Sequence, residues 1–251
     1  MSAFTIGLIA FVCIFGGALA GLVLRAALPE HQLSDDSKDI VKVVTGLIAT
    51  VSALVLGLLI ASAKSTFDDV NAQFKQVAAK VIVVDRTLAQ YGPAAKDARD
   101  LLRSAYAAHV EQLFSAGGTA ASALRDTLSL AQVDAKVRAL VPADDSQRAL
   151  KESAERVVAE VAQVRWLGFE EAATSIPPAF LIVLVSWLAA MFVGFGLFSP
   201  RNATALIALL IGALVLSTSI FLIEEMGRPL SGVISISSEP MRNALAVLST
   251  P

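Results

Sequence analysis

The chain has 251 residues, of which 55% are hydrophobic and 17% are charged, and its mean hydropathy is +0.68. This composition excludes an ordinary soluble domain, and a net charge of −2 provides no basic surface for nucleic acid. The single cysteine and two distant histidines exclude a disulfide framework and a cysteine-based metal site.

Four uncharged segments predict four transmembrane helices. They cover residues 4–24, 43–63, 176–198 and 203–223. An α-helix rises about 1.5 Å per residue, so about 20 residues cross a hydrocarbon core of about 30 Å. A central charge would cost roughly 2.5–3.5 kcal/mol, and the nearest charges, such as Arg25, Lys42 and Lys64, stand at the segment ends. The predicted fold class is therefore an all-α, polytopic membrane protein.

The spans come as two pairs on either side of a polar insert. This pattern divides the chain into a first hairpin (1–63), an insert (64–175), a second hairpin (176–223) and an interfacial C-terminal tail (224–251). With four crossings, the N-terminus, the insert and the tail share one side of the membrane. Lys and Arg near the span ends are more numerous on that side, which predicts an inner-membrane protein with these three parts in the cytoplasm.

The second span is predicted to continue into the insert as one helix, from about residue 39 to residue 90. No proline interrupts it, and apolar residues recur at alternating spacings of three and four, which is a heptad seam. The seam contains Phe67, Val70, Phe74, Val77 and Val81. We expect Gly92 and Pro93 to end this helix.

Another helix is predicted to begin after Asp144 and Asp145, which offer an N-cap, and to lead into the third span. The insert is thus predicted to be a cytosolic helical bundle built from extensions of the second and third spans. Residues 119–143 show only short helical pieces. The acidic residues of the insert, Asp85 among them, are predicted to lie on solvated helix faces.

Two faces of the second span carry the functional prediction. Small residues at Gly46, Ala53 and Gly57 predict close packing against another helix, within one chain or between copies. The other face is predicted to line a pore that has a hydroxylated mouth and an apolar constriction, where dewetting would gate conduction. It comprises Thr45, Ala49, Ser52, Leu56, Leu59 and Ala63. Alternatively, the hydroxyls of this span bond only to their own backbone one turn earlier.

Two acidic residues, Glu224 and Glu225, close the fourth span. Because acids at a helix C-terminus oppose the macrodipole, one of them is predicted to pair with a basic residue such as Arg228 or Arg165. The alternative is two solvated acids at the level of the headgroups. No HExxH, GxxxxGK[ST] or GxSxG motif occurs, so we predict no catalytic residue, metal or cofactor, and no enzyme.

The motifs together resemble the bacterial bestrophin-like domain family, over essentially the whole chain. They are the runs 45–49, 56–64, 67–68, 85–86, 91–93, 195–204, 229–232 and 236–238. The family's name implies a distant relation to bestrophins, which are oligomeric channels that conduct mainly anions. The resemblance implies a homo-oligomer, specifically a pentamer, in contact with membrane lipid, which conducts inorganic ions through a pore lined by the second span. One departure is that the second span contains no aromatic residue.

Two functions are therefore compared below. The first is a homo-oligomeric ion channel, for which the family resemblance implies conduction of anions. The second is a non-conducting membrane scaffold or sensor that acts through its cytosolic bundle. A membrane enzyme is a third possibility, which the missing catalytic motifs disfavour.

Overall fold

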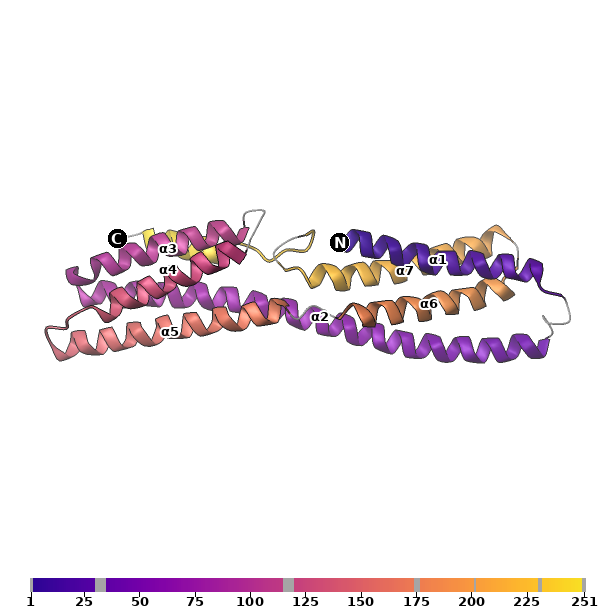
Figure 1. The fold of residues 1–251 in the computed structure, drawn as a ribbon, viewed down its shortest axis with the longest axis horizontal. Helices are drawn as coiled ribbons and strands as arrows, with labels where there is room; N and C mark the ends of the chain where they lie inside the picture. Colours follow the sequence, from indigo (N-terminus) through magenta and orange to yellow (C-terminus); the bar gives the residue numbers. More distant parts are fainter. Residues whose placement is uncertain are drawn as a thin grey trace. The chain divides into compact units, whose positions relative to one another are not determined.

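The computed structural model describes residues 2–29, 35–114, 120–173, 177–200, 202–229 and 232–249. All regular elements in these ranges are helical (Figure 1). They are α1 (Ala3–Ala27), α2 (Asp35–Tyr91), the 3-10 turn η2 (Pro93–Ala95), α3 (Lys96–Phe114), α4 (Ala120–Arg138), α5 (Asp145–Ala173), α6 (Pro178–Phe198), α7 (Ala203–Met226) and α8 (Glu239–Ser249). The all-α prediction is confirmed.

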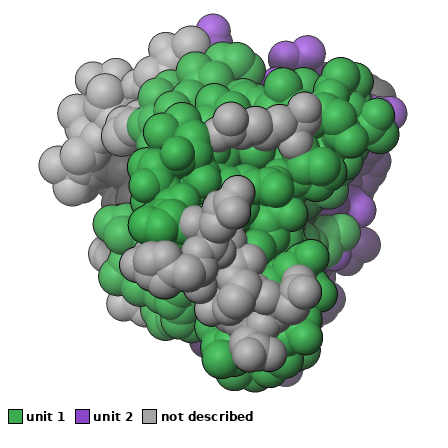
Figure 2. All heavy atoms as spheres, turned by 90° about the vertical axis from the view of Figure 1, so that its right-hand side faces the viewer, with its two compact units in different colours: residues 1–67, 174–228 green, residues 68–173, 229–251 purple. Residues whose placement is uncertain are grey.

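Among the described helices, four are long and apolar enough to cross a membrane, namely α1, α2, α6 and α7. They coincide with the four predicted spans, although α6 begins at Pro178 and the predicted start of the third span at residue 176 lies outside the described residues. The chain folds as two compact units, which Figure 2 colours separately. Unit 1 contains residues 1–67 and 174–228, and unit 2 contains residues 68–173 and 229–251.

The long helix α2 belongs to both units and is unbroken at Lys64, as predicted. It ends before Gly92, whose φ of 107° is a left-handed conformation that favours glycine. Pro93 then starts η2, at a position where its missing N–H costs nothing.

Unit 1 is held together by very close contacts between α1 and α6. A Cβ atom built on Gly17 would lie 2.6 Å from the carbonyl oxygen of Ala189. A Cβ on Gly21 or on Gly196 would likewise collide with the backbone of the other helix. Small residues therefore let the two backbones touch, which is the main source of helix adhesion in lipid. Helix α7 packs on α1 as well.

Unit 2 is a helical bundle whose core includes the second part of α2. Val70, Val77 and Val81 of the predicted seam are buried, and Phe74 packs against Phe114 with ring centroids 6.4 Å apart. Phe67, the first seam residue, packs instead against the core of unit 1. The N-cap prediction is confirmed, since the backbone N–H of Gln147 donates to Asp144 Oδ1 at 2.7 Å at the start of α5.

Sequence periodicity did not reveal α4 or α8. Helix α4 is a single helix, where only short pieces were expected, and it buries Val133 and Val137. Helix α8 lies in the segment expected to be an interfacial tail, and it packs on α3 within unit 2. Its buried residues Met241, Ala244 and Leu248 have helical spacing, so the signal was present but short.

Candidate functional site

The face of α2 that was predicted to line a pore is covered inside unit 1. Thr45, Ser52, Leu56 and Ala63 are only 6%, 2%, 9% and 4% exposed, while Ala49 and Leu59 are partly buried. Leu56 and Ala63 share a hydrophobic core with Leu181, Leu184 and Leu188 of α6. Within one copy, helix α6 therefore covers much of the side of α2 on which the pore lining was predicted.

On this covered face, the side chain of Thr45 packs closely against Gly194 of α6. A Cβ atom on Gly194 would lie 2.9 Å from Thr45 Oγ1 and 3.6 Å from Val41 Cγ1. Gly194 thus provides the room for the hydroxyl of Thr45, and the contact sets which side of α2 faces the core.

The small-residue face of α2 lies on the outside of unit 1. Gly46, Ala53 and Gly57 are exposed, and a Cβ on either glycine would meet no atom within 4 Å in the described structure. Leu54 and Leu58, on the same outer side, are 74% and 71% exposed. Among the described residues, no atom of the same chain contacts this face at either glycine, and packing between copies stays a prediction.

The hydroxyls of the second span behave differently on the two faces. Thr50, on the outer side, donates to the carbonyl oxygen of Gly46 at 2.9 Å, which is the backbone bond expected as the structural alternative. The hydroxyl of Ser52, on the covered side, is buried and has no hydrogen-bond partner among the described residues. An unsatisfied buried hydroxyl costs about 1–3 kcal/mol.

At the other end of the spans, the acids that close α7 lie beside Arg228. Arg228 Nη2 is 3.9 Å from Glu224 Oε2, and the Glu224 side chain is mostly buried. Glu225 is buried as well. The side chain of Arg165, the alternative partner, lies outside the described residues.

Unit 2 contains a buried ion cluster that sequence reasoning missed. The Asp85 side chain is 3% exposed and accepts hydrogen bonds from Nε and Nη2 of Arg99, both at 3.0 Å. Arg103 Nε lies 3.4 Å from the same carboxylate. The hydrogen bond to Asp85 raises the pKa of Arg99 above its ordinary value. The expectation of a solvated Asp85 was wrong, because α3 covers it with two arginines one turn apart.

The sequence does contain a sign that Asp85 is buried. Asp85 lies between Val84 and Leu88, which continue the spacing of the seam and are each only 1% exposed. A bidentate arginine pair of this kind locks the geometry of two helices rather than supplying chemistry. Among the described residues, no group of three His, Cys, Asp or Glu side chains could hold a metal ion.

The comparisons with known proteins agree on one family and one fold. A family model described as Bestrophin-like domain matches residues 12–241. No curated protein matches the chain. A crystal structure of a bacterial bestrophin homologue from Klebsiella pneumoniae, in a tryptophan-to-alanine variant, matches with a TM-score of 0.74 and 14% identity, covering 99% of this chain and 97% of that chain.

Two further structures match similarly. An aspartate-to-alanine variant of the Klebsiella pneumoniae homologue has a TM-score of 0.71 and 14% identity, over 96% of this chain and 98% of that one. A structure described as a membrane protein, in a proline-to-alanine variant, has a TM-score of 0.70 and 15% identity, over 97% and 99%. At these identities the likeness establishes a shared fold, and the roles of individual residues are argued from this chain alone.

Proposed function

Because the chain belongs to the Bestrophin-like domain family, we propose that it forms a homo-oligomeric ion channel in the inner membrane, with α2 lining the pore. The family resemblance supports oligomeric assembly, specifically a pentamer, and favours anions among inorganic ions. Helix α2 is unbroken along its length, which supports a pore wall that a single helix supplies. The excess of Lys and Arg near the span ends on the side of the insert favours a cytoplasmic position for unit 2.

The observation that carries the proposal is the exposed side of α2. A pore shared between copies favours side chains that no helix of the same chain covers, and within one copy Thr45 and Ser52 of the predicted set are buried whereas Leu54 is exposed. We therefore place the wall on the opposite side, along Thr50, Leu54 and Leu58. These residues are four apart, so they follow one another along a single helix face.

The chemistry of that face suits a gated pore. Leu54 and Leu58 would form an apolar constriction that conducts only when wetted, and Thr50 would add a ring of hydroxyls on one side of it. Gly57, which flanks this line, has open space beside it and would let α2 helices of neighbouring copies approach closely.

Conductance of the purified protein in liposomes tests this function. We expect ion currents from the wild-type chain and a clear increase in conductance for Leu58→Ser, because a hydroxyl lowers the barrier to wetting. Leu214→Ser is the matched control, since Leu214 is 56% exposed on α7, away from the proposed wall. Its conductance should equal that of the wild type.

Silent liposomes over a range of voltages and salts, for a protein shown to be folded, would contradict conduction. That result, together with a monomer in detergent, would favour the scaffold or sensor function of unit 2. If Leu58→Ser and Leu214→Ser changed the conductance equally, the protein would still be an ion channel. The proposal that α2 lines its pore would then be contradicted.

A further inference from the structure

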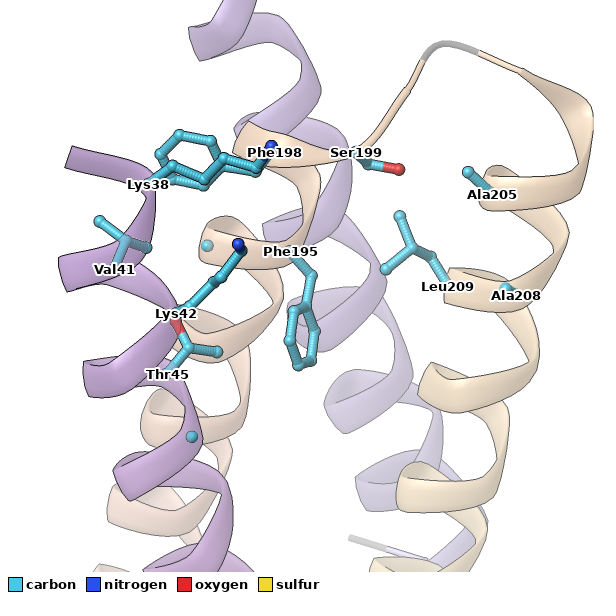
Figure 3. A pocket seen from close by; sticks show the side chains of 12 residues that line it. Lys38, Val41, Lys42, Thr45, Phe195, Phe198, Ser199, Ala205, Ala208 and Leu209 are labelled. Carbon is cyan, nitrogen blue, oxygen red and sulfur yellow. The ribbon is translucent and has the colours of Figure 1, made fainter. Parts of the chain in front are cut away.

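We propose that unit 1 binds an anionic phospholipid in a cavity between α2, α6 and α7. The cavity has a volume of about 470 Å³ and lies where α2 begins its span and α6 ends (Figure 3). This site does not depend on whether the protein conducts ions.

The cavity exists because small residues line three helices at the same level. Gly46, Gly194, Ala205 and Ala208 all border it, and none of them has a side chain that could fill it. Farther along the spans, the space between α6 and α7 is filled by the ring of Phe192. This ring lies 3.3 Å from the position that a Cβ atom on Gly212 would take. The cavity is open to the surface of unit 1 and is large enough to hold part of a ligand.

The lining of the cavity is almost entirely apolar, and two lysine side chains border it. Val41, Phe195, Phe198 and Leu209 supply apolar surface, and Figure 3 shows Leu209 reaching from α7 toward α6. Phe195 is itself 44% exposed, so one wall belongs to the apolar surface that an acyl chain of the bilayer would touch. These walls fit a hydrocarbon chain.

Two lysines, Lys38 and Lys42, complete the lining. They are one helical turn apart and therefore share a face of α2, and the amine of Lys42 reaches toward α6 in Figure 3. Lys42 Nζ lies 3.0 Å from Asp39 Oδ1, but both side chains are highly exposed, so this pair contributes little and is easily exchanged. Amines at the polar end of a span sit where a lipid phosphate would lie.

The combination of features selects one occupant. A free phosphate would be recognised by the lysines but would not use the apolar walls. An apolar side chain from a second copy would fill the walls but would offer the two amines no anion beyond the exposed pair of Lys42 with Asp39. An anionic phospholipid satisfies both parts of the site, because its acyl chain matches the walls and its phosphate matches the lysines.

The test measures lipid binding to the purified, full-length protein in detergent by native mass spectrometry, comparing dioleoyl-phosphatidylglycerol with dioleoyl-phosphatidylcholine. We expect preferential retention of phosphatidylglycerol. The double variant Lys38→Gln/Lys42→Gln should weaken its binding about twenty-five-fold, because each basic residue near an anionic headgroup contributes a factor of about five. Binding of phosphatidylcholine should not change.

Two further variants separate the parts of the site. Lys75→Gln/Lys96→Gln removes the same charge from exposed positions of unit 2 and should bind phosphatidylglycerol like the wild type. Ala208→Phe places a ring in the cavity and should reduce retention of both lipids. Unchanged oligomer size and circular dichroism would show that these variants fold.

Several results would overturn the proposal. One is equal retention of the two lipids by the wild-type protein, which needs no variant to be folded. A second is wild-type binding of phosphatidylglycerol by the Lys38→Gln/Lys42→Gln protein. A third is equal thermal stabilisation by soluble glycerol phosphate, which would indicate an anion site without an acyl chain. A change of oligomer size in Ala208→Phe with lipid retention intact would instead identify an interface between copies.

Discussion

The hydroxyl of Thr45 lies against the bare backbone of Gly194, so close that a Cβ on the glycine would stand 2.9 Å from Thr45 Oγ1. This relationship turns the hydroxylated side of α2 toward α6. The same rotation leaves Gly46, Leu54 and Leu58 on the outside of unit 1. The proposed pore wall follows from this orientation of one helix.

Substitution of Gly194 should therefore destabilise unit 1. Gly194→Ala forces Thr45 or its helix to move, and overpacking of this kind costs about 1–3 kcal/mol. Gly46→Ala is the control on the opposite face, where the added methyl meets no described atom within 4 Å. Thermal unfolding in detergent should show a lower Tm for Gly194→Ala only. Equal Tm values would contradict the Thr45–Gly194 contact.

The backbone contact between α1 and α6 should be still less tolerant. A methyl group on Gly21 would collide with backbone atoms of α6, which have no side-chain freedom with which to yield. We expect Gly21→Ala to abolish recovery of folded protein from membranes. Gly16→Ala, on the same helix but beside open space in the described structure, should be recovered like the wild type. Normal recovery of Gly21→Ala would show that the two helices are farther apart than described.

Removal of the buried carboxylate in unit 2 should cost far more than removal of a surface one. Asp85→Asn leaves Arg99 and Arg103 without their anion, and breaking a buried pair costs about 3–5 kcal/mol. Asp134→Asn breaks the exposed pair with Arg138, which is worth about 0–1 kcal/mol. Chemical denaturation followed by helical circular dichroism compares them. Similar losses for the two variants would mean that Asp85 is not enclosed as described.

Tyr106 should make the stability of unit 2 fall at high pH. Burial raises the pKa of its phenol above the ordinary value of 10.0, so the folded state holds the proton after the unfolded state has released it. Stability contributed in this way is complete below pH 10.0 and declines as pH rises from there toward the folded pKa.

The variant Tyr106→Phe should remove that decline. It should also leave neutral-pH stability equal or higher, because the hydroxyl is buried without a hydrogen-bond partner in the described residues. Denaturation midpoints measured from pH 8 to pH 11 would check both expectations. Parallel pH profiles for the variant and the wild type would contradict the assignment to Tyr106.

The spans and the long helix could be predicted because their signals are local. A charge-free segment needs only its own residues to be recognised, and the course of α2 follows from the absence of proline up to Pro93. The heptad spacing likewise grouped Val77 and Val81 on one face of unit 2 before any neighbour was known.

The covering of each face could not be predicted, because it depends on residues far away in the chain. Thr45 and Gly46 are adjacent, yet one is buried and the other exposed, and Gly194 decides between them. Asp85 is similar, since its burial depends on two arginines of α3. The cavity beside Lys42 arises because glycine and alanine residues of three helices lie at the same level. The periodicity of a single helix cannot predict such an arrangement.

Labelling of single cysteines with a water-soluble maleimide in proteoliposomes tests the central claim most directly. In a Cys13→Ala background, which removes the sole native cysteine, Leu54→Cys is compared with Ser52→Cys and Leu214→Cys. Thiols react as thiolates and therefore need water. We predict labelling at Leu54→Cys alone, because a cysteine in place of leucine lowers the barrier to wetting in the pore, while Ser52 is in the core and Leu214 lies on the outer surface of α7. Labelling at Ser52→Cys without labelling at Leu54→Cys would contradict the account.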